Sequence, residues 1–317
     1  MMVVNKLITG WPITGKWFVS AFVAVVLLLA SIPFSGTQAG KLPDRYTQTP
    51  ENGYFGRMSK VLFDANVTDT TIATDMIIRE VFGSMGMKSE IIVYDDKSML
   101  TNDLANNRID AVFINTIDFL DMQHLIDMKR LYTLIYGDQA EQTVLLLVRN
   151  SDNLDGVSGL RGKSISIPAG HFLGRTYLDV LLMESDYPPI DQYFGKVHET
   201  IDTNTAIVDL YFNKTDAALV SDTAFELASE LNPRIRTNLK PLAESQGMIP
   251  QVIGLNKNIS EKNKARIDGI MSKTHQNKRI KHLLSLFRAN KFIKLNQSDI
   301  NSTQQLIKRY NQLIQPR

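Results

Sequence analysis

The chain has 317 residues, of which 44% are hydrophobic and 21% charged, with 35 lysine and arginine residues against 33 acidic residues and no cysteine. This composition excludes a disulfide-stapled scaffold, a thiolate-ligated zinc or iron–sulfur site and an intrinsically disordered chain. The net charge of +2 also disfavours a nucleic-acid-binding protein, because no overall basic field is available to neutralise phosphates.

Residues 1–39 have the pattern of a secretory signal peptide. Lys6 and Lys16 are the only charged residues in this stretch, and residues 17–30 are apolar with one exception. That run is shorter than the roughly 20 residues that span a bilayer core, and a proline and several small residues follow it. We expect cleavage after Ala39 and a periplasmic location. The alternative is an uncleaved helix that anchors the chain to the membrane by its N-terminus.

After the leader, short apolar runs alternate with helical patterns. The first half predicts strands at residues 60–63, 90–94, 109–114, 131–136 and 142–149, and helices at residues 72–83, 95–106 and 117–128. The second half predicts strands at residues 163–168, 193–198, 215–220 and 250–255, helices at residues 175–185 and 203–212, and a helix opened by Ser221. From residue 260 to the end the pattern is helical. Strands that alternate with helices of roughly 10 to 15 residues indicate βαβ units and parallel sheets covered on both faces.

Three short motifs follow one another in the second half of the chain. They are GLRGKSI at residues 159–165, DAALVS at residues 216–221 followed by ELNP at residues 230–233, and ESQGMIP at residues 244–250. In this order and spacing they resemble the second lobe of periplasmic solute-binding proteins of the phosphonate/phosphite-binding (PhnD-like) ABC transporter family. The resemblance extends over residues 60–271.

The resemblance implies an α/β, two-lobed periplasmic-binding-protein type II fold, with mixed sheets, helices on both sheet faces and two crossing strands as the hinge. We place lobe 1 at residues 40–145 and 252–317, and lobe 2 at residues 146–251. A small ligand would lie between the lobes. One departure leaves the ligand class open, because PAGHFLGRT at residues 168–176 stands where phosphonate-binding members have a Ser/Thr-Gly cluster.

Polar clusters after four of the predicted strands are the candidate ligand site. In open parallel sheets, ligands bind beyond the carboxyl ends of the strands, where helix N-termini favour anions. The hydroxyl groups of these clusters suit an oxyanion, although the same residue types also serve as ordinary helix N-caps. The candidate ligand-binding residues are Thr68, Asp69, Thr70, Thr71, Asn115, Thr116, Gly170, His171, Arg175, Thr176, Ser221, Asp222 and Thr223.

Four of these candidates carry or can carry charge. The guanidinium of Arg175 could bind a carboxylate or phosphonate through two hydrogen bonds, and His171, titrating near its usual pKa of about 6.5, could add positive charge at mild acidity. Asp69 and Asp222 have the opposite effect. If they face the ligand, they would repel a dianion and favour an amine or a zwitterion.

Enzymatic motifs do not support a catalytic function. The triplet GKS at residues 162–164 lacks the upstream glycine of a phosphate-binding loop, since Val157 stands there, and it precedes a strand where that motif needs a helix. The five histidines show no metal-ligand spacing, and no nucleophile-elbow motif occurs. We therefore expect no catalytic residues, no metal and no cofactor.

The leading hypothesis is an exported, monomeric solute-binding protein, without a nucleic-acid partner. It would capture a small anionic ligand, a phosphonate or another oxyanion, and deliver it to an ABC permease. One alternative is the same fold as the ligand-sensing input of a membrane sensor kinase or diguanylate cyclase. A second alternative is a secreted enzyme without a recognisable motif.

Positive charge is concentrated at the C-terminus. From Ser272 onward there are ten lysine and arginine residues and one acid, Asp299. This segment is either a solvated outer face or a surface that docks on an acidic partner or on anionic lipid headgroups.

Overall fold

The computed structural model describes residues 52–61, 67–83, 86, 88–136, 139–286 and 289–315. All of these residues belong to one compact unit. The predicted signal peptide and its cleavage site after Ala39 lie outside the described residues.

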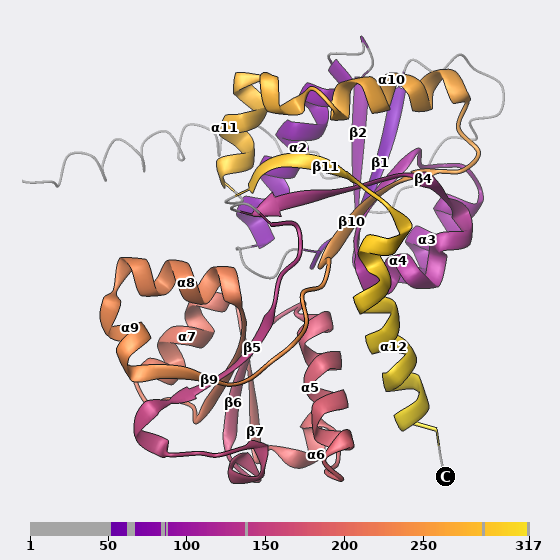
Figure 1. Ribbon diagram of the computed structural model, residues 1–317. Helices are drawn as coiled ribbons and strands as arrows, with labels where there is room; N and C mark the ends of the chain where they lie inside the picture. The colour runs from indigo at the N-terminus through magenta and orange to yellow at the C-terminus, as the bar shows by residue number, and fades with distance from the viewer. Residues whose placement is uncertain are drawn as a thin grey trace, which may run out of the picture. The chain divides into compact units, whose positions relative to one another are not determined.

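The described residues form two β-sheets, one of six strands and one of five (Figure 1). The first sheet has the order β11-β4-β10-β3-β1-β2, and the second has the order β7-β6-β8-β5-β9. The strands are β1 (Asn52–Met58), β2 (Lys88–Tyr94), β3 (Ala111–Asn115), β4 (Ile126–Tyr136), β5 (Val144–Arg149), β6 (Ser164–Pro168), β7 (Lys196–Thr200), β8 (Ala217–Ser221), β9 (Leu239–Glu244), β10 (Gln251–Asn256) and β11 (Ala289–Leu295).

Helices follow most of the strands. The α-helices are α2 (Val67–Gly83), α3 (Lys97–Ala105), α4 (Thr116–Met122), α5 (Phe172–Glu184), α6 (Ile190–Tyr193), α7 (Thr203–Tyr211), α8 (Asp222–Leu231), α9 (Pro233–Asn238), α10 (Glu261–Met271), α11 (Lys278–Leu286) and α12 (Asn301–Leu313). Short 3-10 helices are η1 (Gln123–Leu125), η2 (Asn150–Asp152), η3 (Val157–Leu160), η4 (Thr274–Gln276) and η5 (Gln297–Ile300).

Both sheets are mixed, as predicted. In the first sheet β1 pairs in parallel with β2 and β3, whereas β10 and β11 are antiparallel to their neighbours. In the second sheet β6 pairs in parallel with β7 and β8, whereas β5 is antiparallel to β8 and β9. The parallel strands of each sheet are joined by helices, which gives the predicted βαβ units.

The chain crosses between the sheets twice, and the described residues of the two crossings are 139–143 and 245–250. The two crossing segments pair with each other through an isolated antiparallel bridge between Gln142 and Met248. The backbone N–H of Gln142 donates to the carbonyl of Met248 at 2.8 Å, and the N–H of Met248 donates back at 3.0 Å. Each crossing leads directly into a buried strand, β5 on the way out and β10 on the way back.

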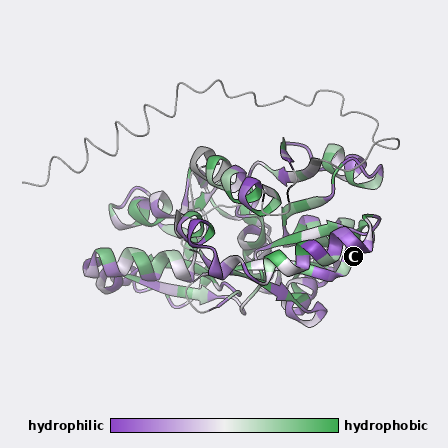
Figure 2. Cartoon of the chain, turned by 90° about the horizontal axis from the view of Figure 1, so that it is seen from above, coloured by the Kyte–Doolittle hydropathy of each residue, from purple (hydrophilic) through white to green (hydrophobic). Residues whose placement is uncertain are grey.

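Hydrophobic side chains cover both faces of each sheet because neighbouring strand residues point to opposite sides. In the first sheet Phe55 and Phe113 belong to a cluster with α2, α10 and α11, whereas Tyr54 and Val112 belong to a cluster on the other face with α3 and α4. The second sheet divides in the same way into two clusters. Figure 2 shows hydrophobic and hydrophilic residues alternating along the helices, as helices that bury one face require.

The first strand lies elsewhere than predicted. We expected a strand at residues 60–63, but Ser59 and Lys60 form a turn, and the strand is β1, just before it. The sequence of β1 contains two glycines and an arginine, which are poor strand signals. Gly53 is required there by packing, because a Cβ atom would lie 2.1 Å from the ring of Phe82.

Two further predictions are wrong at the ends of helices. The helix predicted over residues 117–128 stops at Met122, and β4 already begins at Ile126. The C-terminal segment is not helical throughout, because β11 pairs antiparallel with β4 along the edge of the first sheet. In both cases pairing with a neighbouring strand overrides the local helical pattern.

Helix α12 connects the cores of the two sheets. Ile300, at its start, is buried in a cluster of the first sheet, whereas Leu306 packs against a cluster of the second sheet. Figure 1 shows α12 alongside α5, and an ion pair of 2.5 Å joins Nε of Arg309 to Oε1 of Glu184 at the end of α5. The last helix of the chain therefore contacts elements of both sheets.

No helix in the part of residues 52–315 that the structure describes has both the length and the apolar content needed to cross a bilayer.

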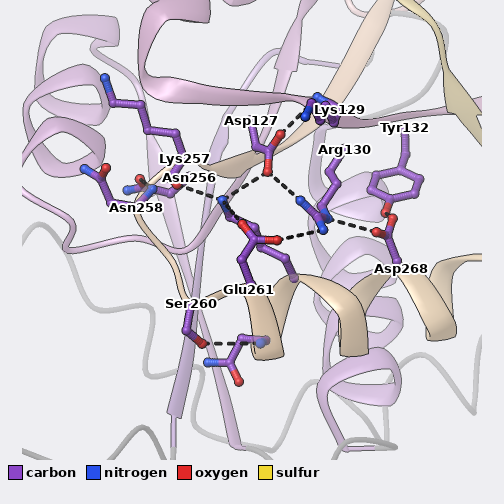
Figure 3. A network of polar contacts seen from close by, with 12 residues as sticks. Asp127, Lys129, Arg130, Tyr132, Asn256, Lys257, Asn258, Ser260, Glu261 and Asp268 are labelled. Carbon is purple, nitrogen blue, oxygen red and sulfur yellow. Dashed lines mark hydrogen bonds and ion pairs between the residues drawn. The ribbon is translucent and has the colours of Figure 1, made fainter.

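A network of charged groups fastens α10 to β4 (Figure 3). Arg130 donates to Asp127 and Asp268 at 2.8 Å each, and Lys264 contacts Asp127 at 3.0 Å. Tyr132 also donates to Asp268. The side chain of Asp127 is only 11% exposed. Burial by itself would raise the pKa of Asp127. Hydrogen bonds from Lys129, Lys264 and Arg130 outweigh this effect and hold the pKa below its usual value.

We expect Asp127→Asn to lower the free energy of unfolding by about 2 kcal/mol at pH 7, because two cations lose a largely buried partner. A carboxylate with a lowered folded-state pKa stabilises the fold above its unfolded pKa of about 3.9, and loses this contribution as the pH falls through the folded value. Urea denaturation should therefore show the difference between the variant and the wild type shrinking as the pH is lowered below the unfolded pKa of about 3.9.

The matched control is Asp121→Asn, which removes an exposed partner of Lys97. It should cost less than about 1 kcal/mol. Equal losses for the two variants at pH 7 would contradict a special role for the Asp127 network.

Candidate functional site

The parallel strands of each sheet point their carboxyl ends toward a set of helix N-termini. In the first sheet α3 and α4 begin within three residues of the ends of β2 and β3, and in the second sheet α5, α7 and α8 begin within four residues of the ends of β6, β7 and β8. Such edges are where ligands bind in open α/β sheets. They are therefore the candidate functional site.

The first predicted cluster lies at the start of α2. This helix begins at Val67, so Thr68, Asp69, Thr70 and Thr71 form its first turn and not the loop before it. The predicted helix start at residue 72 is therefore too late. The role of these four residues in ligand binding stays a prediction.

Asn115 and Thr116 lie between β3 and α4 and are buried. The side-chain oxygen of Asn115 caps α4 by accepting from the backbone N–H of Asp118 at 2.8 Å. The hydroxyl of Thr116 donates to the carbonyl of Ile249 at 2.5 Å, and its N–H donates to the carbonyl of Pro250 at 3.1 Å. Asn115 thus caps α4, and Thr116 fixes the start of this helix against the second crossing segment.

Gly170 and His171 follow β6. Gly170 has φ of +82°, and a Cβ atom there would lie 2.9 Å from the carbonyl oxygen of Lys60, so glycine is required for two reasons. His171 is 1% exposed. Burial lowers its pKa to about 3, although an interaction with the backbone of Leu219 opposes this shift. The expectation that His171 adds positive charge at mild acidity is therefore wrong.

Arg175 and Thr176 lie in the first turns of α5, which begins at Phe172 and not at Arg175 as predicted. The guanidinium of Arg175 forms an ion pair of 3.5 Å with Asp191 on α6. The hydroxyl of Thr176 donates to the carbonyl of Phe172 at 3.0 Å. Both side chains therefore have partners on the second-sheet side, and the structure does not bring Arg175 to the crossing segments.

Ser221, Asp222 and Thr223 join β8 to α8. Ser221 is the N-cap of α8 and accepts from the N–H of Ala224 at 3.2 Å. The N–H of Asp222 donates to the carbonyl of Thr143, and the side chain of Gln142 donates to the hydroxyl of Thr223 at 3.3 Å. This cluster is thus tied to the first crossing segment.

Asp222 also lines a pocket of about 430 Å³ between β9 and the helices α8 and α9. Its lining includes Glu226 and Glu244 as well as Arg236, whose guanidinium lies 5.8 Å from the ring centre of Phe225. Both signs of charge are present. None of the other predicted ligand-binding residues lines this pocket.

Two cationic residues at the end of β1 were missed by the sequence analysis. Arg57 is fully buried, and burial lowers its pKa to about 10 while the charges of Asp75 and Asp95 oppose the shift. It therefore stays protonated at neutral pH. Lys60 follows in the turn, and its ammonium group lies 3.5 Å from a carboxylate oxygen of Glu199 at the end of β7. A strand assignment for residues 52–58 would have been needed to find either residue.

The structure therefore brings some candidates together and leaves others apart. Thr116 and Thr223, from different sheets, contact the paired crossing segments, and Gly170 contacts Lys60. Within the part of the chain that is described, no cluster of three histidine, aspartate or glutamate side chains is placed to hold a metal ion.

Residues 67–300 match the model of a family described as the periplasmic substrate-binding protein of a phosphonate ABC transporter. No curated protein sequence matches the chain at a significant level.

Solved structures with the same fold include PhnD1 from Prochlorococcus marinus in complex with methylphosphonate, with 13% identity, a TM-score of 0.64 and coverage of 83% of this chain and 99% of that one. A binding protein component of an ABC phosphonate transporter from Pseudomonas aeruginosa has 12% identity, a TM-score of 0.62 and coverage of 84% and 88%. XAC2383 from Xanthomonas citri, bound to ATP, has 14% identity, a TM-score of 0.62 and coverage of 83% and 98%. These similarities establish the type II periplasmic-binding-protein fold.

The burial of His171 predicts a pH dependence of the free energy of unfolding. Its pKa falls from about 6.5 in the unfolded chain to about 3 in the folded protein. Between these values the unfolded chain binds one more proton, so His171 should reduce the free energy of unfolding by about 1.4 kcal/mol per pH unit as the pH falls. Above pH 6.5 its contribution should be constant.

Urea denaturation of wild type and His171→Gln between pH 4 and pH 7 measures this contribution as a difference, which removes the titration of the carboxylates. The variant should lose less stability than the wild type on acidification. His198→Gln, at a partly exposed position on β7, is the control and should follow the wild type. A constant difference between His171→Gln and wild type would show that His171 is not held neutral by burial.

Proposed function

Because this chain belongs to the phosphonate-binding family of periplasmic substrate-binding proteins of ABC transporters, we propose that it captures a small anionic ligand and presents it to an ABC permease. The ligand is a phosphonate or another oxyanion. The family consists of binding proteins and not of enzymes.

One observation carries this proposal beyond family membership. The N-terminus of α4 comes from the first sheet and the N-terminus of α8 from the second, and both are hydrogen-bonded to the paired crossing segments, through Thr116 and Thr223. Two helix N-termini that are fixed near one place present N–H groups and positive dipole ends to a common ligand. This supports capture between the sheets.

The preference for an anion is supported by the positive charge at the end of β1. Arg57 is buried there and stays protonated at neutral pH, and Lys60 lies in the turn that follows. The acidic residues of the same edge, Asp222 and Glu199, oppose a strongly negative ligand. A ligand with one anionic group, with or without an amine, agrees with both sets of charges.

Ligand capture proceeds by closure of two lobes around the ligand. Lobe 1 comprises residues 40–145 and 252–317, and lobe 2 comprises residues 146–251. The distribution of strands supports this division to within two residues. The first sheet takes strands from both parts of lobe 1, and the second sheet lies between them in the chain, from β5, which begins at Val144, to β9. The ligand stabilises the closed state because it contacts both lobes only in that state.

The leader directs export to the periplasm, where the family functions. Lys6 and Lys16 followed by the apolar residues 17–30 support a signal peptide that is cleaved after Ala39. The mature protein is a monomer that meets the permease in the periplasm.

Thermal denaturation of the protein purified from a periplasmic fraction tests this function. Methylphosphonate, 2-aminoethylphosphonate, phosphite, methanesulfonate and acetate are added one at a time, with ethylamine as a cationic control. At a hundredfold excess over Kd, a true ligand should stabilise the folded protein by about 2.7 kcal/mol and raise Tm.

At least one anion should raise Tm, and ethylamine should not. If only the amine stabilises the protein, the proposed ligand charge is wrong. If mass spectrometry detects reaction products of an added compound after incubation with the protein, the protein is instead an enzyme.

A further inference from the structure

The turn after β1 is held in place from inside the protein. Nη1 of Arg57 donates to the carbonyl of Met58 at 3.2 Å, and the N–H of Ser59 donates to the carbonyl of Tyr94 at the end of β2 at 2.9 Å. Arg57 is 0% exposed, so its guanidinium cannot exchange the carbonyl of Met58 for water without moving the strand. The backbone of Lys60 therefore leaves the sheet from a fixed position.

This turn touches the second sheet through backbone. A Cβ atom at Gly170 would lie 2.9 Å from both the Cβ atom and the carbonyl oxygen of Lys60. Since Gly170 follows β6, Lys60 lies at the carboxyl ends of strands from both sheets. This is the edge where an α/β protein binds its ligand.

The side chain of Lys60 is occupied by a carboxylate of the second sheet. Its Nζ lies 3.5 Å from Oε1 of Glu199, and the two side chains are 51% and 64% exposed. Exposed ion pairs of this kind contribute little to stability, because water and salt screen them. The pair can therefore be opened at low cost by another anion.

An oxyanion that reaches this edge meets an ammonium group with a carboxylate already beside it. Two anions at one ammonium repel each other, so the gain from binding the lysine is reduced by the charge of Glu199. If the oxyanion replaces the carboxylate of Glu199, the ammonium group of Lys60 keeps one anionic partner before and after the exchange.

We propose that Lys60 determines the specificity of the ligand site for anions, and that Glu199 occupies the ammonium group of Lys60 until the ligand displaces it. This inference rests on the proposed function and names the group that selects the ligand. The ligand carries an anionic group at least as large as a carboxylate. This group takes the place of the Glu199 carboxylate at the ammonium group of Lys60.

Isothermal titration calorimetry of the periplasmically purified chain with methylphosphonate, phosphite, methanesulfonate and acetate tests the proposal. Lys60→Ala should weaken the anion that binds wild type by about tenfold or more, as expected for the loss of a charged hydrogen bond. Glu199→Gln should tighten it by about two- to fivefold, as expected when an exposed ion pair no longer competes.

The double variant separates displacement from long-range repulsion. If Glu199 acts by occupying Lys60, Glu199→Gln should have no effect on affinity, within twofold, when Lys60 is already alanine. If it acts only through its distant charge, the tightening persists in the double variant and the proposal is wrong. Lys214→Ala and Glu230→Gln make the same charge changes at other exposed positions of the second-sheet side, and should leave the affinity unchanged.

The other possible results of the titrations separate this inference from the proposed function. Anion binding that is unchanged in Lys60→Ala, or weakened in Glu199→Gln, overturns this inference and leaves the proposed function intact. If none of the four anions binds the wild type, the proposed function fails and this inference fails with it.

Discussion

The two crossings of the chain between the sheets pair with each other and hold the helix starts of both sheets in place. Gln142 and Met248 exchange backbone hydrogen bonds where the outgoing and returning segments run side by side. The helix starts at Thr116 and Asp222, one from each sheet, are bonded to the backbone of these same segments. The helix starts of the candidate site are therefore held to the crossing segments by backbone hydrogen bonds.

Most of the polar residues at the strand ends have structural partners of their own. Asn115 and Ser221 cap helices, and Thr116 binds a crossing carbonyl. Arg175 is paired with Asp191. The charges that face one another across the strand ends are instead those of Lys60 and Glu199. N-capping and ligand binding are compatible, because a capped helix still offers other N–H groups of its first turn.

The sequence predicted the buried strands well and the irregular ones poorly. β3, β5, β8 and β10 are buried on both faces, so they appear as continuous apolar runs. β1 and β11 carry glycine, arginine or lysine residues, and their places are decided by neighbouring strands that lie far away in the chain. The capping residues of the site could be recognised locally. The contact of Lys60 with Gly170 and Glu199 could not, because no local pattern links residues so distant in sequence.

The final helix, α12, restricts rotation of one sheet against the other. Because α12 is rooted by Ile300 in a core of the first sheet and lies with Leu306 against a core of the second, it forms a third tether beside the two crossings. A rotation of one sheet against the other must slide or peel this helix from α5, including the contact of Arg309 with Glu184. The Arg309–Glu184 pair is exposed and contributes little, so it is the apolar packing of α12 against both cores that opposes such a rotation.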